Sequence, residues 1–138
     1  MHTIHSFGDS EATIYGPGGS FRLGDDPTES ITIRDSDTYK SKSGADGFIE
    51  RIHKAGPTYI TVKLLKTSLV NALLSQLHQV NHQSPANWGR NTIKIVRLGE
   101  DVTTCEALAF ADYDHPSGDH GGQIWWEFIG SKDACHGR

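Results

Sequence analysis

The eight residues at positions 58–65 alternate in polarity, and this pattern constrains the fold more than any other stretch of the chain. Apolar side chains stand at every second position, at Ile60, Val62 and Leu64, with more polar residues between them. Such alternation is typical of a β-strand that buries one face. Further short runs rich in β-branched and aromatic residues recur between turns rich in Gly, Pro and Asp. They cover residues 11–15, 20–23, 30–34, 38–43, 48–54, 92–98, 102–112 and 123–130.

One segment has a helical period instead. Ser68 is a candidate helix N-cap, because its hydroxyl can accept a hydrogen bond from a backbone N–H of the first turn. Apolar residues then recur at helical spacing to about residue 82, and we expect Leu73, Leu74 and Leu77 to be core. The opposite face carries no formal charge, either by chance or because it lies against another protein, where unpaired charges would be costly. This face comprises Asn71, Ser75, Gln76, His78, Gln79 and His82.

The order of the elements is many strands, one helix and then more strands, which favours a mainly β fold of the α+β kind. We expect a β-sandwich or barrel of antiparallel strands, with the helix over about residues 68–82 on its flank. At 138 residues, the chain has the length of one ordinary domain. Because no repeat or linker divides it, residues 1–138 are predicted to form a single domain.

Composition argues against several classes of protein. The formal net charge of −4 does not suit a protein that grips nucleic-acid phosphates. No apolar run reaches the length of a membrane span, and the N-terminus lacks a signal-peptide core. We therefore expect no membrane partner, and a protein that stays in the cytoplasm until it joins a larger assembly. Cys105 and Cys135 form no CxxC pair, and we expect two reduced thiols that hold no zinc.

Charges are strongly segregated along the chain. Residues 1–50 hold nine acidic and four basic side chains, residues 51–98 hold seven basic and no acidic ones, and residues 99–138 hold eight acidic and two basic ones. Either acidic and basic strands pair within one sheet, or the blocks form complementary faces that join subunits. For the second alternative, the candidate interface residues are Lys63, Lys66, Arg90, Lys94 and Arg97.

The sequence contains no motif for catalysis or cofactor binding. The glycine-rich segment 16–20 lacks the Gly-Lys-Ser/Thr ending that cradles phosphates, so we expect a turn. Residues 112–120 combine three carboxylates and two imidazoles that could bind a divalent metal, but their Gly, Pro and Ser content favours a mobile hairpin tip. His78 and His82 have a metal-binding spacing but no accompanying carboxylate, so surface histidines are the simpler interpretation. We predict a protein that is not an enzyme and holds no metal or cofactor.

Short motifs in a fixed order over most of the chain carry a family resemblance. They comprise residues 12–14, 16–21, 23–24, 44–47, 62–68, 70–72, 88–89, 91, 109–110, 121–122 and 126–128, of which 62–68 is the most specific. In these motifs the chain resembles a family of small phage structural proteins assigned as tail tube proteins of contractile tails. It departs from the family at residues 112–120 and 132–138, which are loop and terminus.

This resemblance implies a structural virion protein whose hexameric rings stack into an inner tail tube, with β-sheets lining the lumen. DNA would pass through the lumen at ejection without specific binding. The implied partners are further copies of the chain, the tail sheath protein, and baseplate and tail-terminator proteins, with assembly in the host cytoplasm. One alternative is another ring-forming β protein, such as a type VI secretion-like tube or a tail terminator. A carbohydrate-binding β-sandwich is a more distant one, because Trp125 and Trp126 are adjacent on one strand and face opposite ways.

Overall fold

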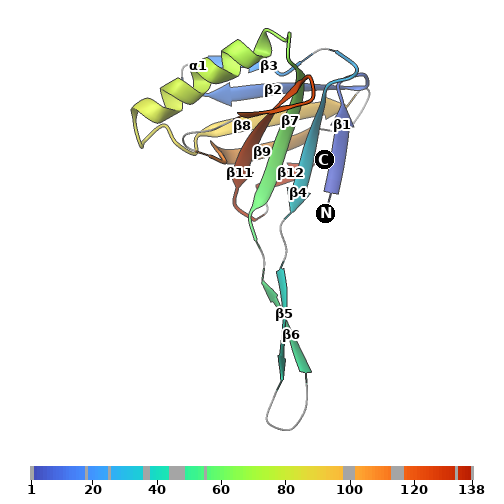
Figure 1. The fold of residues 1–138 in the computed structure, drawn as a ribbon. Helices are drawn as coiled ribbons and strands as arrows, with labels where there is room; N and C mark the ends of the chain where they lie inside the picture. The colour runs from blue at the N-terminus through green and yellow to red at the C-terminus, as the bar shows by residue number, and fades with distance from the viewer. Residues whose placement is uncertain are drawn as a thin grey trace.

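Strands dominate the structure, and one helix accompanies them in the described part of the chain (Figure 1). The computed structural model describes residues 2–17, 19–24, 26–35, 38–43, 49–54, 56–97, 102–112, 117–132 and 134–137. The helix is α1 (Val70–Gln83). The strands are β1 (His2–Ser6), β2 (Ser10–Gly16), β3 (Gly19–Arg22), β4 (Ser30–Asp35), β5 (Thr38–Ser43), β6 (Ile49–Lys54), β7 (Thr58–Leu65), β8 (Asn91–Arg97), β9 (Val102–Phe110), β10 (Ser117–His120), β11 (Gln123–Gly130) and β12 (Cys135–Gly137). The predicted mainly β fold with one flanking helix is therefore confirmed.

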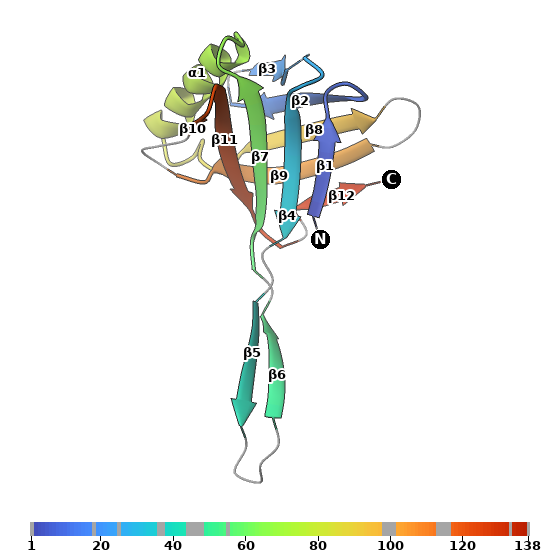
Figure 2. The same cartoon turned by 45° about the vertical axis from the view of Figure 1, so that its right-hand side comes forward.

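Ten of the strands form one antiparallel sheet that bends into two layers. The order is β1-β4-β7-β11-β9-β8-β2-β3, with β10 beside β11 and β12 beside β9. In Figure 2, β1, β4, β7 and β11 run side by side in one layer, and β9, β8 and β2 cross behind them. The two layers join where Phe128 and Ile129 of β11 pair with Phe110 and Ala109 of β9. This arrangement is a sandwich of crossed layers, which the twist of β-strands favours.

The hydrophobic core fills the space between the layers. β7 supplies Ile60, Val62 and Leu64, which are all fully buried, so the predicted alternation of this strand is confirmed. From the other layer, β8 contributes the buried side chains of Ile93 and Ile95. Burying one such aliphatic side chain stabilises the folded state by about 1.5–3 kcal/mol relative to leaving it in water.

Helix α1 closes one side of the sandwich, because it contacts β11 of one layer through Asn71 and β2 and β8 of the other layer. Its buried side chains are Leu74, Leu77 and Asn81. Gly16 of β2 lies so close to the helix that a Cβ added there would stand 2.7 Å from the Leu77 Cδ1 atom. The helix is bonded to β8 as well, since the Asn91 Nδ2 donates to the Asn81 Oδ1 over 2.9 Å.

Two expectations about the faces of α1 are wrong. Leu73, predicted to be core, is 39% exposed. Asn71 and His78, predicted on the outward polar face, are half-buried. The Asn71 Nδ2 donates to the Leu65 carbonyl oxygen over 2.9 Å, and the His78 ring packs edge-on against Phe110 at a centroid distance of 5.0 Å. These contacts draw the two polar side chains inward and turn Leu73 toward solvent.

The expectation of a mobile hairpin tip over residues 112–120 is wrong for strand β10, which covers the last four of these residues. Ser117–His120 pairs antiparallel with β11. The connection is made by Gly121 and Gly122, whose φ angles of +58° and +91° both lie in the left-handed region. A two-residue hairpin turn that matches strand twist needs this backbone, which glycine adopts without steric cost. Residues 113–116 lie outside the described residues.

The expectation of two reduced thiols is wrong for this structure. Cys105 of β9 and Cys135 of β12 form a disulfide. The two strands pair in a register that puts Cys135 directly opposite Cys105. Because 30 positions separate the two cysteines in sequence, only the strand pairing brings them together.

Candidate assembly site

A two-stranded hairpin stands apart from the sandwich. Within the described residues, β5 and β6 pair with each other and with no other strand. Figures 1 and 2 show the hairpin extending beyond the body, from the end where β4 stops and β7 starts. A lone two-stranded hairpin is at best marginally stable in water. A further surface is therefore expected to hold it.

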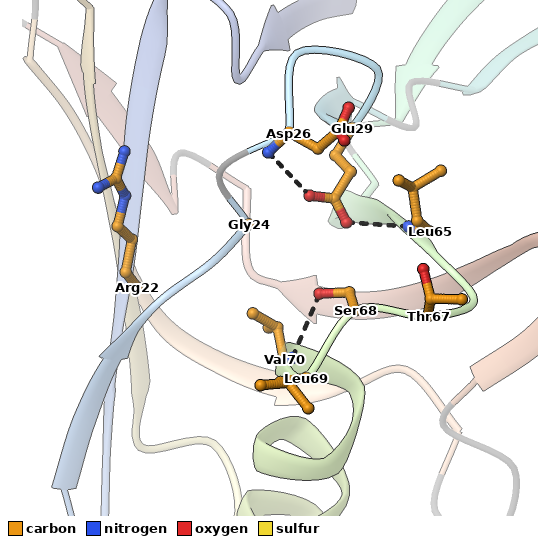
Figure 3. Close-up of a pocket in the computed structure, with 9 residues that line it drawn as sticks. All are labelled: Arg22, Gly24, Asp26, Glu29, Leu65, Thr67, Ser68, Leu69 and Val70. Carbon is orange, nitrogen blue, oxygen red and sulfur yellow. Dashed lines mark hydrogen bonds between the residues drawn. The ribbon is translucent and has the colours of Figure 1, made fainter.

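The opposite end of the same two strands carries a pocket, here named the end pocket. The β4–β7 register pairs Asp35 with Thr58 at the hairpin end, and Ser30 with Lys63 near the pocket. The end pocket has a volume of about 320 Å³ and lies between the β3–β4 loop, the end of β7 and the start of α1 (Figure 3). Its lining comprises Arg22, Gly24, Asp26, Glu29, Leu65, Thr67, Ser68, Leu69 and Val70.

A buried carboxylate ties the walls of the end pocket together. Glu29 is 1% exposed. One of its oxygens accepts a hydrogen bond from the Asp26 N–H over 3.1 Å, and the other accepts one from the Leu65 N–H over 2.9 Å (Figure 3). These bonds offset the unfavourable burial of the carboxylate and join the β3–β4 loop to the last residue of β7. The walls of the end pocket are therefore held in place by hydrogen bonds within the chain.

Glycine is required at one corner of the end pocket. Gly24 has a φ of +65°, in the left-handed region that side chains disfavour. A Cβ at this position would stand 2.8 Å from the Phe7 Cδ2 and 3.0 Å from the Glu29 Oε1. The missing side chain thus lets the core residue Phe7 and the wall residue Glu29 approach the same stretch of backbone.

Apolar side chains extend from the rim of the end pocket along α1. Leu69 is 84% exposed at the start of the helix, and Leu73 is 39% exposed one turn later. A second groove of about 270 Å³ runs between α1 and β3, with Phe21, Leu73 and Val80 among its lining residues. Apolar surface that is contiguous in this way is more typical of an interface than single scattered side chains are.

The same rim carries a carboxylate. It belongs to Asp26, which lines the end pocket. Hydrogen bonds from the hydroxyl and the backbone N–H of Thr28, over 2.6 and 2.9 Å, hold the pKa of Asp26 below its ordinary value. Arg22 on the other wall lies 3.4 Å from the Glu11 carboxylate, which takes up part of its charge. Asp26 therefore stays ionised at the mouth of the pocket.

The predicted cap at the start of α1 takes a modified form. The Ser68 hydroxyl accepts a hydrogen bond from the Val70 N–H over 3.2 Å, although Leu69 occupies the N-cap position. Asn71 completes the junction, because its Oδ1 accepts from the Trp126 Nε1 over 2.9 Å. The chain around the exposed Leu69 is consequently fixed on both sides.

The five basic candidates fall into two groups. Those at the end of β7 have partners in their own chain. The ammonium of Lys63 lies 4.4 Å from the Trp125 ring centroid, and the Lys66 Nζ lies 3.0 Å from an Asp119 carboxylate oxygen. The hydrogen bond from Lys66, and then its charge, lower the pKa of Asp119. The second group is exposed in or beside β8 and comprises Arg90, Lys94 and Arg97.

The tryptophans do not form a single stacking platform. Trp126 is 4% exposed and packs in the core, whereas Trp125 lies on the other face of β11. The His120 ring stacks on Trp125 at a centroid distance of 3.9 Å, and Lys63 covers the same indole. Trp88 lies in the turn after α1 and is half-buried. The contacts of Trp125 with its own chain compete with stacking on a sugar.

Metal-ligating side chains do not gather in the described part of the chain, where no group of three or more His, Cys, Asp or Glu residues could hold an ion. The rings of His78 and His82 are 5.6 Å apart, but His78 packs edge-on against Phe110 and Trp88. Asp114 and His115 of the acidic segment lie outside the described residues. Among the described residues, no helix is long and apolar enough to cross a membrane.

Sequence comparison gives the family. The model of a family described as "Bacteriophage PhiTE tail tube protein" matches residues 1–135 of the 138. No curated protein matches the chain. Because the family model spans nearly the whole sequence, this chain belongs to the bacteriophage PhiTE tail tube protein family.

Proposed function

We propose that copies of this chain form hexameric rings, and that the rings stack into the inner tube of a contractile phage tail. Membership of a tail tube family supports a structural role in the virion. The observation that carries the stacking is the β5–β6 hairpin, which extends beyond the sandwich and pairs with no other described strand. In this proposal, residues 1–138 act as one tail-tube-like domain.

The stacking contact joins the hairpin of one copy to the end pocket of the next. The two features lie at opposite ends of β4 and β7, so a shift along these strands brings one against the other. Their charges are complementary, since segment 38–54 holds four basic and two acidic side chains in the sequence, and the ionised Asp26 lies at the mouth of the end pocket. Complementary charge favours the correct orientation and faster association more than raw affinity.

Basic residues supply a second set of contacts in this proposal, and all of them except the half-buried Lys63 are exposed. Lys63, Lys66, Arg90, Lys94 and Arg97 are the candidates. An exposed ion pair contributes at most about 1 kcal/mol, so one pair does not hold a ring in place. A contact between rings repeats each pair around the circle, and the small contributions then add.

The remaining partners follow from the role in a tail. The tube passes DNA at ejection and does not bind it specifically, which the net charge of −4 supports because it disfavours a grip on phosphates. The outer surface meets the tail sheath protein, and the ends of the tube meet baseplate and tail-terminator proteins. Rings assemble in the host cytoplasm and leave the cell as part of the virion. The chain is not an enzyme, and it needs no cofactor for this role.

Electron microscopy of the purified full chain tests the stacking. We expect tubes from the wild-type protein. A variant in which a short Gly-Ser linker replaces residues 38–54 should still unfold cooperatively on heating, because the sandwich remains, but it should form no tubes. Tubes from this variant, or a wild-type protein that stays monomeric at all salt concentrations, would contradict the proposal. Single wild-type rings that never stack would instead favour a tail-terminator role.

Point variants separate the end pocket from general surface effects. Leu69→Ser removes an apolar side chain that is 84% exposed, so folding should be unaffected while stacking is lost. Ile4→Ser is the matched control, since Ile4 is an apolar residue of β1 that is 60% exposed and lies outside the pocket. Asp26→Lys should also abolish tubes, and adding Lys40→Glu and Lys42→Glu to the same chain should restore some of them. Equal loss with the Leu69 and Ile4 variants would show that the pocket has no special role.

A further inference from the structure

The Cys105–Cys135 pair joins the end of the chain to the sandwich. Cys105 is fully buried, and Cys135 is half-buried at the start of β12. These are the two cysteines of the chain, and strand register alone places them opposite each other. The pair therefore meets as soon as β12 lies on β9, whatever the oxidation state of the sulfur atoms.

Strand β12 covers a length of β9 that would otherwise be an open edge. It pairs with β9 from Gly137 opposite Thr103 to Cys135 opposite Cys105, and the Ala134 carbonyl oxygen extends the pairing by accepting from the Glu106 N–H over 3.0 Å. An uncovered strand edge invites pairing with other chains. The cover is short, because β12 has three residues.

Few other contacts hold β12 in place. His136 Nε2 lies 3.7 Å from a Glu106 carboxylate oxygen, but both side chains are 62% exposed, so water screens this pair. Ala134 packs in the core as a small side chain. The sulfur–sulfur bond is therefore the strongest tether of the C-terminal strand among the described residues.

We propose that this pair is a redox-controlled cross-link, here named the redox staple. It stays open as two thiols during synthesis and assembly, and it closes as a disulfide after the virion leaves the cell. The timing rests on the proposed function, because a tail subunit is made in a compartment that keeps thiols reduced and later works outside it. The accessible Cys135 thiolate attacks a low-molecular-weight disulfide, forms a mixed disulfide and releases one small thiol. Cys105 then displaces the second small thiol and closes the staple. Each cysteine loses one proton and one electron, and the small disulfide is reduced to two thiols.

Closing the staple changes stability without rebuilding the fold. The strand register already holds both residues in place, so assembly proceeds in either state. The bond links positions 30 residues apart and restricts the unfolded chain accordingly. Reduction should lower the melting temperature by about 10 °C for a domain of this size. It should also speed hydrogen exchange of the β12 backbone amides, since β12 can then leave β9 more often.

Thiol trapping tests the timing. Infected cells are lysed in a denaturant that contains N-ethylmaleimide, so that the buried Cys105 is also reached. The trapped protein is compared by mass spectrometry with that of released virions that were held with oxidised glutathione and then treated in the same way. We expect two maleimide adducts in the intracellular protein and none in the virion protein. A disulfide already present in the cell, or two adducts in these virions, would overturn the proposal.

Purified full-length protein separates the staple from the proposed function. Oxidised glutathione should close the pair, and a reductant should then lower the melting temperature. A Cys105→Ala/Cys135→Ala variant should melt at the same temperature with and without reductant. If the melting temperature of the wild type does not depend on reductant, the redox proposal is wrong even when tubes form. If the melting temperature shifts but no tubes form, the redox proposal holds and the proposed tail-tube assembly is wrong.

Discussion

Two neighbouring leucines in α1 differ sharply in their contribution to stability. Leu74 is fully buried, whereas Leu73 is 39% exposed. Leu74→Ala should lower the free energy of unfolding by about 3 kcal/mol, because it removes buried methyl groups and leaves a cavity. Leu73→Ala should cost less than about 1 kcal/mol, as surface substitutions usually do. Urea titration followed by circular dichroism measures both free energies. Equal losses would show that the helix is rotated about its axis, so that Leu73 and Leu74 are buried to the same extent.

The contacts of single residues also explain why the sequence alone does not predict the end pocket. Its wall depends on Glu29, whose charged side chain would ordinarily be assigned to the surface. What buries it is a pair of backbone N–H donors, one of them at Leu65, 36 positions away. No local pattern reports a hydrogen bond over that separation. Gly24 gives a partial signal, since a glycine beside acidic residues suggests a turn, but not which atoms come close to it.

Among the elements, α1 is fastened to the sheet by a buried amide pair. The Asn91 Nδ2 donates to the Asn81 Oδ1 and to the Leu108 carbonyl oxygen, each over 2.9 Å. Asn91→Ala would leave both acceptors buried without this donor, and it should cost about 2–3 kcal/mol. Gln79→Ala on the exposed side of the same helix should cost less than about 0.5 kcal/mol. Thermal melts compare the two variants, and a neutral Asn91→Ala would mean that water replaces the amide.

Sequence pattern predicts an element well when the element is long and has one buried face. The strand at positions 58–65 satisfies both conditions, and its bounds match the observed β7. Strands β1, β10 and β12 satisfy neither, because they have three to five residues and mixed polarity. They exist because β4, β11 and β9 offer an unpaired edge. Runs rich in β-branched and aromatic residues likewise predict strands over residues 38–43 and 48–54. They do not say that these strands leave the main sheet, since composition carries no information about the pairing partner.

At the scale of the whole molecule, charge segregation should make the proposed assembly sensitive to salt. Exposed basic residues lie in and beside β8, and acidic side chains outnumber basic ones in the sequence segments that flank the basic block. The Debye length falls from about 10 Å at 0.1 M salt to about 3 Å at 1 M, so tube growth should slow as salt rises. Light scattering measures this growth, and the circular dichroism spectrum should stay constant. Lys94→Glu combined with Arg97→Glu should leave single rings without tubes. If growth does not depend on salt and this variant still forms tubes, the charge segregation serves only ion pairing within one chain.

The hairpin and the end pocket lie at opposite ends of β4 and β7, and this separation gives any series of copies joined through them a polarity. All members point the same way, so one tip presents empty pockets and the other presents unpaired hairpins. A head-to-tail contact that does not close into a ring can be repeated without limit. The chain therefore encodes direction but not length. Length has to come from molecules that recognise the tips, and because the tips are chemically unlike, starting the series and ending it require two different recognition surfaces.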